Sequence, residues 1–494
     1  MIVETPEIHW HGKNNKSEAI YSAHVQPQPS SSSSSSPASY RIVTGGVSEI
    51  RIWLLTPASR DAMEMPQLEF RASLERHEAT INVVRFSPDG QMLASGDVDG
   101  LVILWRFVSE LKNAKGIPES ELGCVNLETW TSTKVLRKHV SEVTDLAWSP
   151  DGTMLVTSSV DDSSIVWDVE KGAMLKTMGD AEHYVLGANW DPYNRFIVTL
   201  SADKALRVYN PSTTLTAPLQ KVMRYNVDEL NTEAMFIGED NCMARRRLDF
   251  SPDGKHLLAP AGATRVDPKV EGGKKIACSY LFDVSRKQKM TAKAILPATA
   301  PTSLARFCPK MFTLREYTKP EVLQATPTKS TTSEEDDVDD EAEADTESEP
   351  SEAMEVERSG SPEIPPPPRR EEEEKQPVLY RLVYAVATTS TVFFYDTQLH
   401  RPFGFVESIH VADISDIAWT PDGRILVVSS LDGFCTFIEF VEGELGEEYV
   451  APPRPQYELD FVQPIELDVT SITAQEPVAA NQPAATSDVV MQAA

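Results

Sequence analysis

Short apolar stretches separated by polar turns repeat along most of the chain. Valine, leucine, isoleucine and aromatic residues dominate the apolar stretches, which is typical of buried β-strands. Within each turn proline presets φ, and a following glycine or asparagine accepts a positive φ, so each repeat predicts a hairpin. The five turns are Ser87-Pro88-Asp89-Gly90, Ser149-Pro150-Asp151-Gly152, Asp191-Pro192-Tyr193-Asn194, Ser251-Pro252-Asp253-Gly254 and Thr420-Pro421-Asp422-Gly423.

A later strand of each repeat carries an aromatic side chain at or near its end. Seven such strands can be aligned, which predicts seven four-stranded sheets, or blades. The sequence therefore predicts an all-β fold, a seven-bladed WD40 β-propeller. The seven strands are Ile50–Trp53, Leu101–Trp105, Ser164–Trp167, Leu206–Tyr209, Tyr280–Phe282, Val392–Tyr395 and Cys435–Ile438.

Composition sets the expected boundaries of this propeller. We expect it to span residues 1–442, with the strand from Val3 to Trp10 completing blade seven. Residues 318–377 are acidic, proline-rich and almost free of aromatic residues, which predicts a disordered insert within blade six. Residues 443–494 are predicted to be a disordered tail, and the connector around residues 227–235 to be partly helical.

Histidine, hydroxyl, aspartate and aromatic residues recur at matching spacings in several repeats. Such residues can form the catalytic group of a hydrolase, but an active site occurs once, whereas this pattern recurs. We therefore predict buried hydrogen-bond networks that tie loops to strands. Two repeats deviate, with Val47 where an aspartate is expected and Val428 at the hydroxyl position. The residues assigned to networks are His77, Ser95, Asp99, Trp105, His139, Thr157, Asp161, Trp167, Thr199, Asp203, His410 and Asp432.

The net charge of −29 is concentrated in one segment. Residues 334–374 contain 19 acidic residues and three arginines, a net charge of −16. This segment would repel DNA and attract basic proteins, while the mildly acidic remainder is unlike a basic DNA-binding surface. We therefore expect no direct DNA binding.

Two further features suggest modification or targeting. Arg245-Arg246-Arg247 is compatible with a nuclear-import patch, with a phosphate contact or, as we favour, with a solvated strand edge. Ser333 precedes acidic residues and Ser361 precedes a proline, so both match short kinase-acceptor patterns.

Other functional classes find no support in the sequence. Five cysteines are scattered without a Cys-x-x-Cys pair, which predicts neither disulfides nor a zinc site. No nucleotide, metal or catalytic motif is present, so we expect no cofactor and no enzyme activity. The sequence contains no apolar run of about 20 residues, so it predicts no membrane span. We also expect no secretory signal at the N-terminus.

Several strings resemble the WD40 subunit of chromatin assembly factor 1, the middle-sized of its three subunits. The strings of blades six and seven are not general features of WD40 repeats, which makes the resemblance specific. The resemblance covers residues 1–317 and 378–442. The histone-regulation repressor propellers are the nearest related family. The strings are Glu7–His11, Asn82–Pro88, Trp190–Pro192, Leu206–Tyr209, Tyr380–Ala387, Tyr395–Gln398, Pro402–Phe405 and Ser429–Cys435.

The resemblance implies a nuclear, non-catalytic scaffold that binds the large and small subunits of the complex. It also implies support for deposition of histones H3–H4 on newly replicated or repaired DNA. The family's Arg-Arg-hydrophobic motif for the chaperone anti-silencing function 1 is absent from the tail, where Arg454 is the only basic residue, which puts that contact in doubt. The acidic segment would attract histones or act as a solvating spacer. Its first acidic residues are Glu334, Glu335, Asp336, Asp337, Asp339, Asp340 and Glu341.

Two alternatives remain open at this stage. A histone-regulation repressor-type chaperone subunit would share the fold. A WD40 substrate receptor of a cullin ubiquitin ligase would usually carry a Trp-Asp-x-Arg strand end, whereas Trp167-Asp168 is followed by Val169-Glu170. A propeller enzyme would need a polar cluster that occurs in a single repeat, and none is evident in the sequence.

Overall fold

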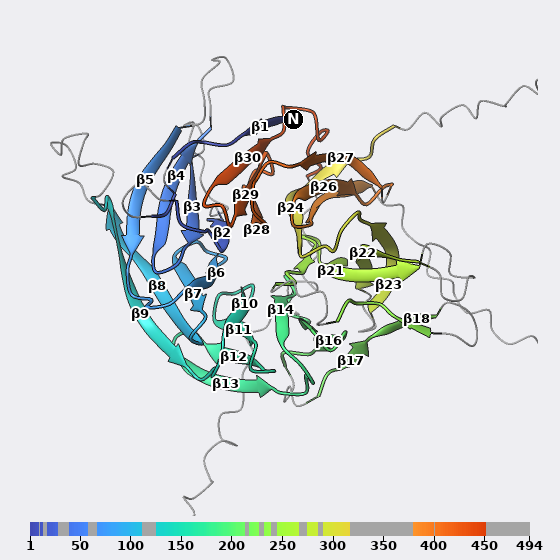
Figure 1. Ribbon diagram of the computed structural model, residues 1–494, viewed down its shortest axis with the longest axis horizontal. Helices are drawn as coiled ribbons and strands as arrows, with labels where there is room; N and C mark the ends of the chain where they lie inside the picture. Colours follow the sequence, from blue (N-terminus) through green and yellow to red (C-terminus); the bar gives the residue numbers. More distant parts are fainter. Residues whose placement is uncertain are drawn as a thin grey trace, which may run out of the picture. The chain divides into compact units, whose positions relative to one another are not determined.

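The described part of the chain folds into seven four-stranded antiparallel sheets arranged around a common axis (Figure 1). In this computed structural model the described residues form strands and no helix. The prediction of a seven-bladed, all-β propeller is therefore confirmed. The described residues are 1–8, 10–12, 17–27, 39–57, 67–110, 125–212, 217–226, 232–238, 245–265, 274–284, 290–316, 379–399 and 401–450.

Each of the first four blades is built from four consecutive strands, in order from the axis outward. Blade one contains β2 (Ser22–Val25), β3 (Tyr40–Gly45), β4 (Ile50–Thr56) and β5 (Gln67–Leu74). Blade two contains β6 (Ile81–Phe86), β7 (Met92–Asp97), β8 (Leu101–Glu110) and β9 (Glu128–Arg137). Blade three contains β10 (Val143–Trp148), β11 (Met154–Ser159), β12 (Ser164–Asp168) and β13 (Ala173–Met178). Blade four contains β14 (Val185–Trp190), β15 (Ile197–Ser201), β16 (Leu206–Tyr209) and β17 (Gln220–Val222).

The last three blades complete the ring. Blade five contains β20 (Asp249–Phe250), β21 (His256–Arg265), β22 (Lys275–Val284) and β23 (Met290–Pro297). Blade six contains β24 (Leu304–Thr313), β25 (Tyr380–Ala387), β26 (Thr391–Asp396) and β27 (Pro402–Glu407). Blade seven contains β28 (Ile414–Trp419), β29 (Ile425–Ser430), β30 (Cys435–Glu439) and β1 (Ile2–Glu4).

Blade seven joins the beginning of the chain to its last strands. β1 pairs antiparallel with β30, and Val3 lies opposite Ile438. The strand is shorter than predicted: it ends at Glu4, close to Pro6, which has no N–H to donate to a ladder. Trp10, predicted as the end of this strand, instead packs fully buried against Trp53, with ring centroids 5.1 Å apart.

The repeated turns connect the first strand of a blade to the second. In the turn after β6 the N–H of Gly90 donates to the carbonyl of Ser87 at 2.8 Å, and Gly90 has a φ of 68°. The left-handed φ explains why glycine is needed at this position. Asn194 takes the same place in blade four, with a φ of 58°.

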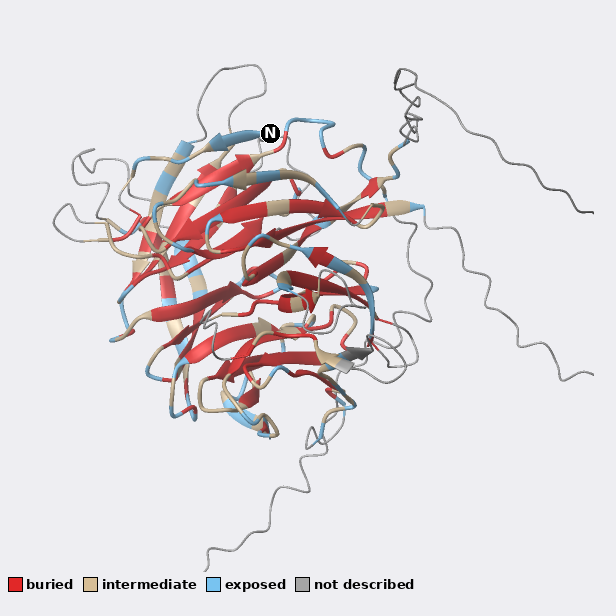
Figure 2. Ribbon diagram, turned by 45° about the vertical axis from the view of Figure 1, so that its right-hand side comes forward, coloured by how far each residue is buried: buried red, intermediate tan, exposed pale blue. Residues whose placement is uncertain are grey.

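The apolar core lies between neighbouring blades. Figure 2 shows that the central strands of the sheets are almost continuously buried, while exposed residues gather on the outermost strands. The cluster between blades seven and one contains Trp10, Trp53 and Phe437, all at most 6% exposed. Burial of such faces is the main favourable contribution to closing the ring.

Two expectations about connectors need correction. The connector predicted to be helical forms a hairpin where it is described, because β18 (Arg224–Asn226) pairs with β19 (Thr232–Ala234). Residues 443–450, which were predicted to belong to the disordered tail, pack on blade six instead: the N–H of Tyr449 donates to the carbonyl of Met311 at 2.8 Å. The insert 318–377 and residues 451–494 lie outside the described residues.

The substitution Trp10→Ala tests closure between the first and last blades. We expect a loss of about 3–5 kcal/mol in the free energy of unfolding, because a fully buried indole at a blade interface would leave a cavity. Urea unfolding measures the change. The control Val140→Ala, at a side chain 87% exposed, should change stability by less than about 0.5 kcal/mol. Equal values for both variants would show that the N-terminal segment does not support closure.

Candidate binding site in the central channel

The predicted hydrogen-bond network of blade two uses a different aspartate from the one expected. His77 Nδ1 lies 2.7 Å from Asp97 Oδ2, His77 Nε2 lies 2.7 Å from Ser95 Oγ, and Trp105 Nε1 donates to Ser95 Oγ at 2.9 Å. The assignment of Asp99 was wrong. Asp97 ends β7 next to the imidazole, and its second oxygen accepts the N–H of Asp99 at 3.0 Å, whereas Asp99 itself is exposed.

Blade three brings together all four residues assigned to it. His139 contacts Asp161 at 2.9 Å and Thr157 at 2.8 Å, and Trp167 Nε1 donates to Thr157 at 2.9 Å. These bonds join the loop before β10 to β11 and β12. Because every polar group in the chain of bonds has a partner, the arrangement stabilises the blade and leaves no acceptor for a substrate.

Blade seven replaces one member of the network. His410 Nδ1 lies 3.0 Å from Asp432 Oδ2, but Val428 has no hydroxyl, and Nε2 lies 3.1 Å from Thr436 Oγ1 on the neighbouring strand. Thr436 also lies 2.6 Å from the hydroxyl of Thr5. The network therefore extends to the N-terminal segment, which sequence spacing did not indicate.

Blade four uses an arginine in place of histidine. Arg207 Nε donates to Asp180 Oδ2 at 2.8 Å, and its guanidinium also pairs with Asp203. Burial opposes ionisation of Asp203, but hydrogen bonds from Arg207 and Ser201 lower its pKa to about 2. Thr199 is buried on β15, directly opposite Arg207 of β16.

Blade one contains a network that sequence analysis missed. His11 Nε2 lies 2.8 Å from Thr44 Oγ1, which also accepts from Trp53 Nε1 at 3.3 Å. Burial and nearby Arg51 lower the pKa of His11 to about 3, so its imidazole is neutral. The signal was hidden because His11 lies 33 residues before its hydroxyl partner, compared with 18 in blades two and three.

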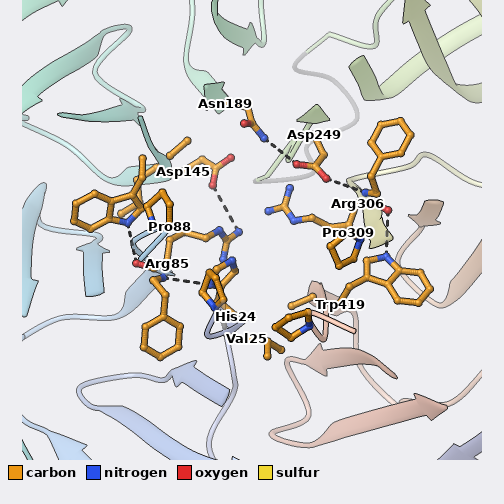
Figure 3. A pocket seen from close by; sticks show the side chains of 18 of the residues that line it. His24, Val25, Arg85, Pro88, Asp145, Asn189, Asp249, Arg306, Pro309 and Trp419 are labelled. Carbon is orange, nitrogen blue, oxygen red and sulfur yellow. Dashed lines mark hydrogen bonds and ion pairs between the residues drawn. The ribbon is translucent and has the colours of Figure 1, made fainter. Parts of the chain in front are cut away.

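A cavity of about 400 Å³ lies in the central channel, where the innermost strands meet (Figure 3). Polar side chains project into it from six blades, and proline and aromatic side chains complete its wall. Four of the prolines follow or interrupt innermost strands of different blades, so the cavity lies at one end of the channel. The polar residues are His24, Arg85, Asp145, Asn189, Asp249 and Arg306, and the four prolines are Pro27, Pro88, Pro309 and Pro421.

An ion cluster lies beside this cavity. Asp416 Oδ2 accepts from Arg85 Nη1 at 2.8 Å and also pairs with Arg247. Asp145 lies 3.8 Å from Arg85 and 3.6 Å from Arg247. Burial alone would raise the pKa of Asp416, but the facing guanidinium groups of Arg247 and Arg85 hold it far below its ordinary value. Strands β6, β10 and β28 and the segment just before β20 are thereby joined across the axis.

Ser22 of blade one donates to the same Asp416 oxygen at 2.7 Å, and the N–H of Ala23 donates to it at 3.1 Å. The cluster therefore has partners in five of the seven blades.

Two of the three arginines favoured as a solvated strand edge are buried instead, and Arg245 is half-buried. Arg246 and Arg247 are at most 1% exposed. Arg246 donates to the carbonyls of Ser201 and Gly238, and Arg247 donates to the carbonyl of Asn82 at 2.7 Å. Their guanidinium groups therefore serve as internal connections. Sequence reasoning missed this role because a run of three arginines gives no sign that it lies next to the axis, just before β20.

Other predicted residues add no site within the described chain. Cys278 and Cys308 are buried free thiols, and burial raises the pKa of each to about 12. The described residues contain no group of three histidine, cysteine or acidic side chains placed to hold a metal ion. They also contain no helix long and apolar enough to cross a membrane. Ser333, Ser361 and the acidic residues from Glu334 to Glu341 lie outside the described residues.

Comparison with known proteins places the propeller among chromatin proteins. The family model of the CAF1B/HIR1 beta-propeller domain matches residues 1–445. The B subunit of chromatin assembly factor 1 from Mus musculus is 35% identical over 90% of this chain and 68% of its own length. Its counterpart of the same name from Gallus gallus is 34% identical over 90% and 69%. Protein HIR1 of Yarrowia lipolytica is 26% identical over 90% of this chain and 38% of its own length.

The substitution Asp416→Asn tests the ion cluster. We expect a loss of about 3–5 kcal/mol in the free energy of unfolding, because Arg85 and Arg247 would lose their shared counter-charge while remaining buried. Chemical denaturation measures the change. The matched control is Asp413→Asn, which removes an exposed carboxylate three residues earlier and should change stability by less than about 0.5 kcal/mol. Similar values for both variants would contradict the role of the cluster.

The buried His11 predicts a pH dependence. Because the folded-state pKa is about 3 and the unfolded-state pKa is near 6.5, the unfolded chain binds a proton that the folded chain excludes. The stability linked to neutral His11 is complete above pH 6.5 and falls as pH decreases, with a slope of up to about 1.4 kcal/mol per pH unit.

Urea unfolding between pH 8 and pH 5 should show this slope as a difference between the natural chain and His11→Gln. Above pH 7.5 the two stability curves should be parallel, which provides the internal control. Curves that stay parallel down to pH 5 would refute a neutral, buried His11.

Proposed function

Since the chain belongs to the CAF1B/HIR1 β-propeller family, we propose that it is a non-catalytic scaffold subunit of the chromatin assembly factor 1 complex. In this role it supports replication- and repair-coupled deposition of histones H3–H4 onto DNA. The observation that carries the proposal is the similarity to the mouse chromatin assembly factor 1 protein, which extends over 90% of this chain at 35% identity. A role in this complex places the protein in the nucleus.

The geometry supports a scaffold. Seven sheets are packed edge to edge around an axis, and five of them are joined by one buried ion cluster. Such a ring offers a broad surface that keeps its shape when partners dock, which lowers the entropic cost of binding. The recurring histidine networks are fully used inside the blades, which supports a role without catalysis.

The proposed partners are the large and small subunits of the complex and, directly or through them, H3–H4. The proposal includes no direct DNA binding and no membrane contact. Contact with anti-silencing function 1 is left out, because the tail lacks the expected basic motif. The segment from Glu334 to Glu341 would attract histones electrostatically, an effect that salt would screen.

A subunit of the histone-regulation repressor type is the second candidate. Its support is the 26% identity to Protein HIR1 of Yarrowia lipolytica over 90% of this chain. The lower identity to HIR1, 26% compared with 35% for the mouse relative, favours the first candidate. The cullin-receptor alternative gains no support from these relatives.

Affinity purification of the tagged full chain from nuclear extract tests the proposal. Mass spectrometry should identify the large and small subunits of chromatin assembly factor 1 together with H3 and H4, and the tag alone should recover none of them. Recovery of HIR-complex subunits without the large subunit would favour the second candidate, and recovery of a cullin adaptor would contradict both.

The same purification with a chain lacking residues 330–375 separates the two roles of the acidic segment. Loss of histones at low salt, with the subunits retained, supports electrostatic attraction. Unchanged histone recovery supports a spacer.

A further inference from the structure

Arg306 lies in the wall of the central cavity, on β24. Its Nη1 donates to the carbonyls of Leu248 and Ala305, each at 3.2 Å. Within the described ranges no carboxylate lies within 4 Å of this guanidinium, and its remaining N–H groups have no hydrogen-bond partner. Figure 3 shows the guanidinium extending into the cavity. The guanidinium of Arg306 can therefore donate further hydrogen bonds to a group in the cavity.

The other charged groups of the wall already have partners. Arg85 pairs with Asp416 at 2.8 Å. Asp249, the acidic residue nearest to Arg306 along the wall, accepts the N–H of Phe307 at 2.8 Å and the side-chain amide of Asn189 at 3.2 Å. Arg85 and Asp249 therefore provide no partner for Arg306, whose remaining N–H groups are able to donate to an acceptor within the cavity.

Positive charge reaches the cavity from two sides. Its wall contains two arginines, Arg85 and Arg306, and two aspartates, Asp145 and Asp249. Asp145 takes part in the ion cluster, and Asp249 accepts two hydrogen bonds. Figure 3 shows Arg85 and Arg306 reaching toward the cavity from opposite sides, so an entering anion would meet positive charge from both.

The rest of the wall suits the side chain of a polypeptide. Pro88, Pro309 and Pro421 and the indoles of Trp148 and Trp419 contribute apolar surface around the arginines. A volume of about 400 Å³ lies in the range of small ligand sites, so it admits one or two side chains and excludes a folded domain.

We propose that this cavity binds a carboxylate side chain from an extended acidic segment of a partner protein, with Arg306 as its anchor. The planar guanidinium matches a carboxylate with two parallel N–H···O bonds. The prolines and tryptophans pack on the methylene groups next to that carboxylate. This assignment concerns the propeller alone and is independent of which chromatin complex contains it.

Binding of fluorescein-labelled octaglutamate, measured by fluorescence anisotropy, tests the proposal. The full chain should bind the peptide, and a labelled Gly-Ser peptide of equal length should not bind. Arg306→Gln should weaken binding by about tenfold or more, since hydrogen bonds between charged groups are among the strongest in proteins. Arg306→Lys keeps the charge without the planar fork and should show an intermediate loss.

The matched control is Arg401→Gln, which removes an exposed arginine of the same blade and should bind as the natural chain does. Thermal unfolding of each variant confirms that it is folded, and Arg306→Lys keeps the test valid if Arg306→Gln does not fold. The assay is repeated with a chain lacking residues 330–375, which removes the chain's own densest run of competing carboxylates.

Three outcomes would overturn the proposal. The first is no binding at 1 mM peptide by either the full chain or the chain lacking residues 330–375. The second is equal affinity for the natural chain and both Arg306 variants. The third is displacement of the peptide by inorganic phosphate at lower concentrations than by glutarate, which would indicate a phosphate site rather than a carboxylate site.

Discussion

The buried carboxylate of Asp416 constrains how the blades meet at the axis, while apolar burial between the blades supplies most of the stability of the ring. A single unpaired carboxylate at the axis would cost several kcal/mol, and the compensation comes from distant parts of the chain. Ser22, Arg85 and Arg247 supply donors from blades one, two and five, and none of them lies near Asp416 in sequence. The charge is therefore tolerated only when the blades have taken their places around the axis. Closure of the ring and formation of the Asp416 ion pairs therefore occur together.

The same constraint explains the character of the central cavity. Arg85 and Arg247 are paired with aspartates, whereas Arg306, in the described wall, has no carboxylate within 4 Å. The hydrogen-bond networks in blades one, two, three, four and seven fix the loops and strands farther from the axis. A propeller of this kind combines a stiff periphery with a small polar centre, which suits a protein that holds other proteins together.

Local sequence patterns predicted the blades, whereas contacts between residues far apart in the sequence were missed. The turns and the seven aromatic strands identified the blades because hairpins depend on neighbouring residues. The network of blade three followed from spacing, since its four residues belong to one hairpin and its preceding loop. Asp99 was chosen in place of Asp97 as the partner of His77, because the two aspartates lie two residues apart in the sequence. The position of the imidazole in the fold shows that Asp97 is the partner. Arg247 was read as solvated because burial near the axis arises from closure, which leaves no trace in a local sequence window.

The use of N-terminal residues in the last blade has a consequence for biosynthesis. Ile2–Glu4 can pair with β30 only after residue 439 has been synthesised. The hydrogen bond between the hydroxyls of Thr5 and Thr436 likewise forms only after residue 436 has been added. At 5–20 residues per second this delay is on the order of tens of seconds. During that time residues 2–4 have no sheet to join, so they are available to chaperones on the ribosome. A truncation that removes β30 would leave Ile2–Glu4 without a partner strand.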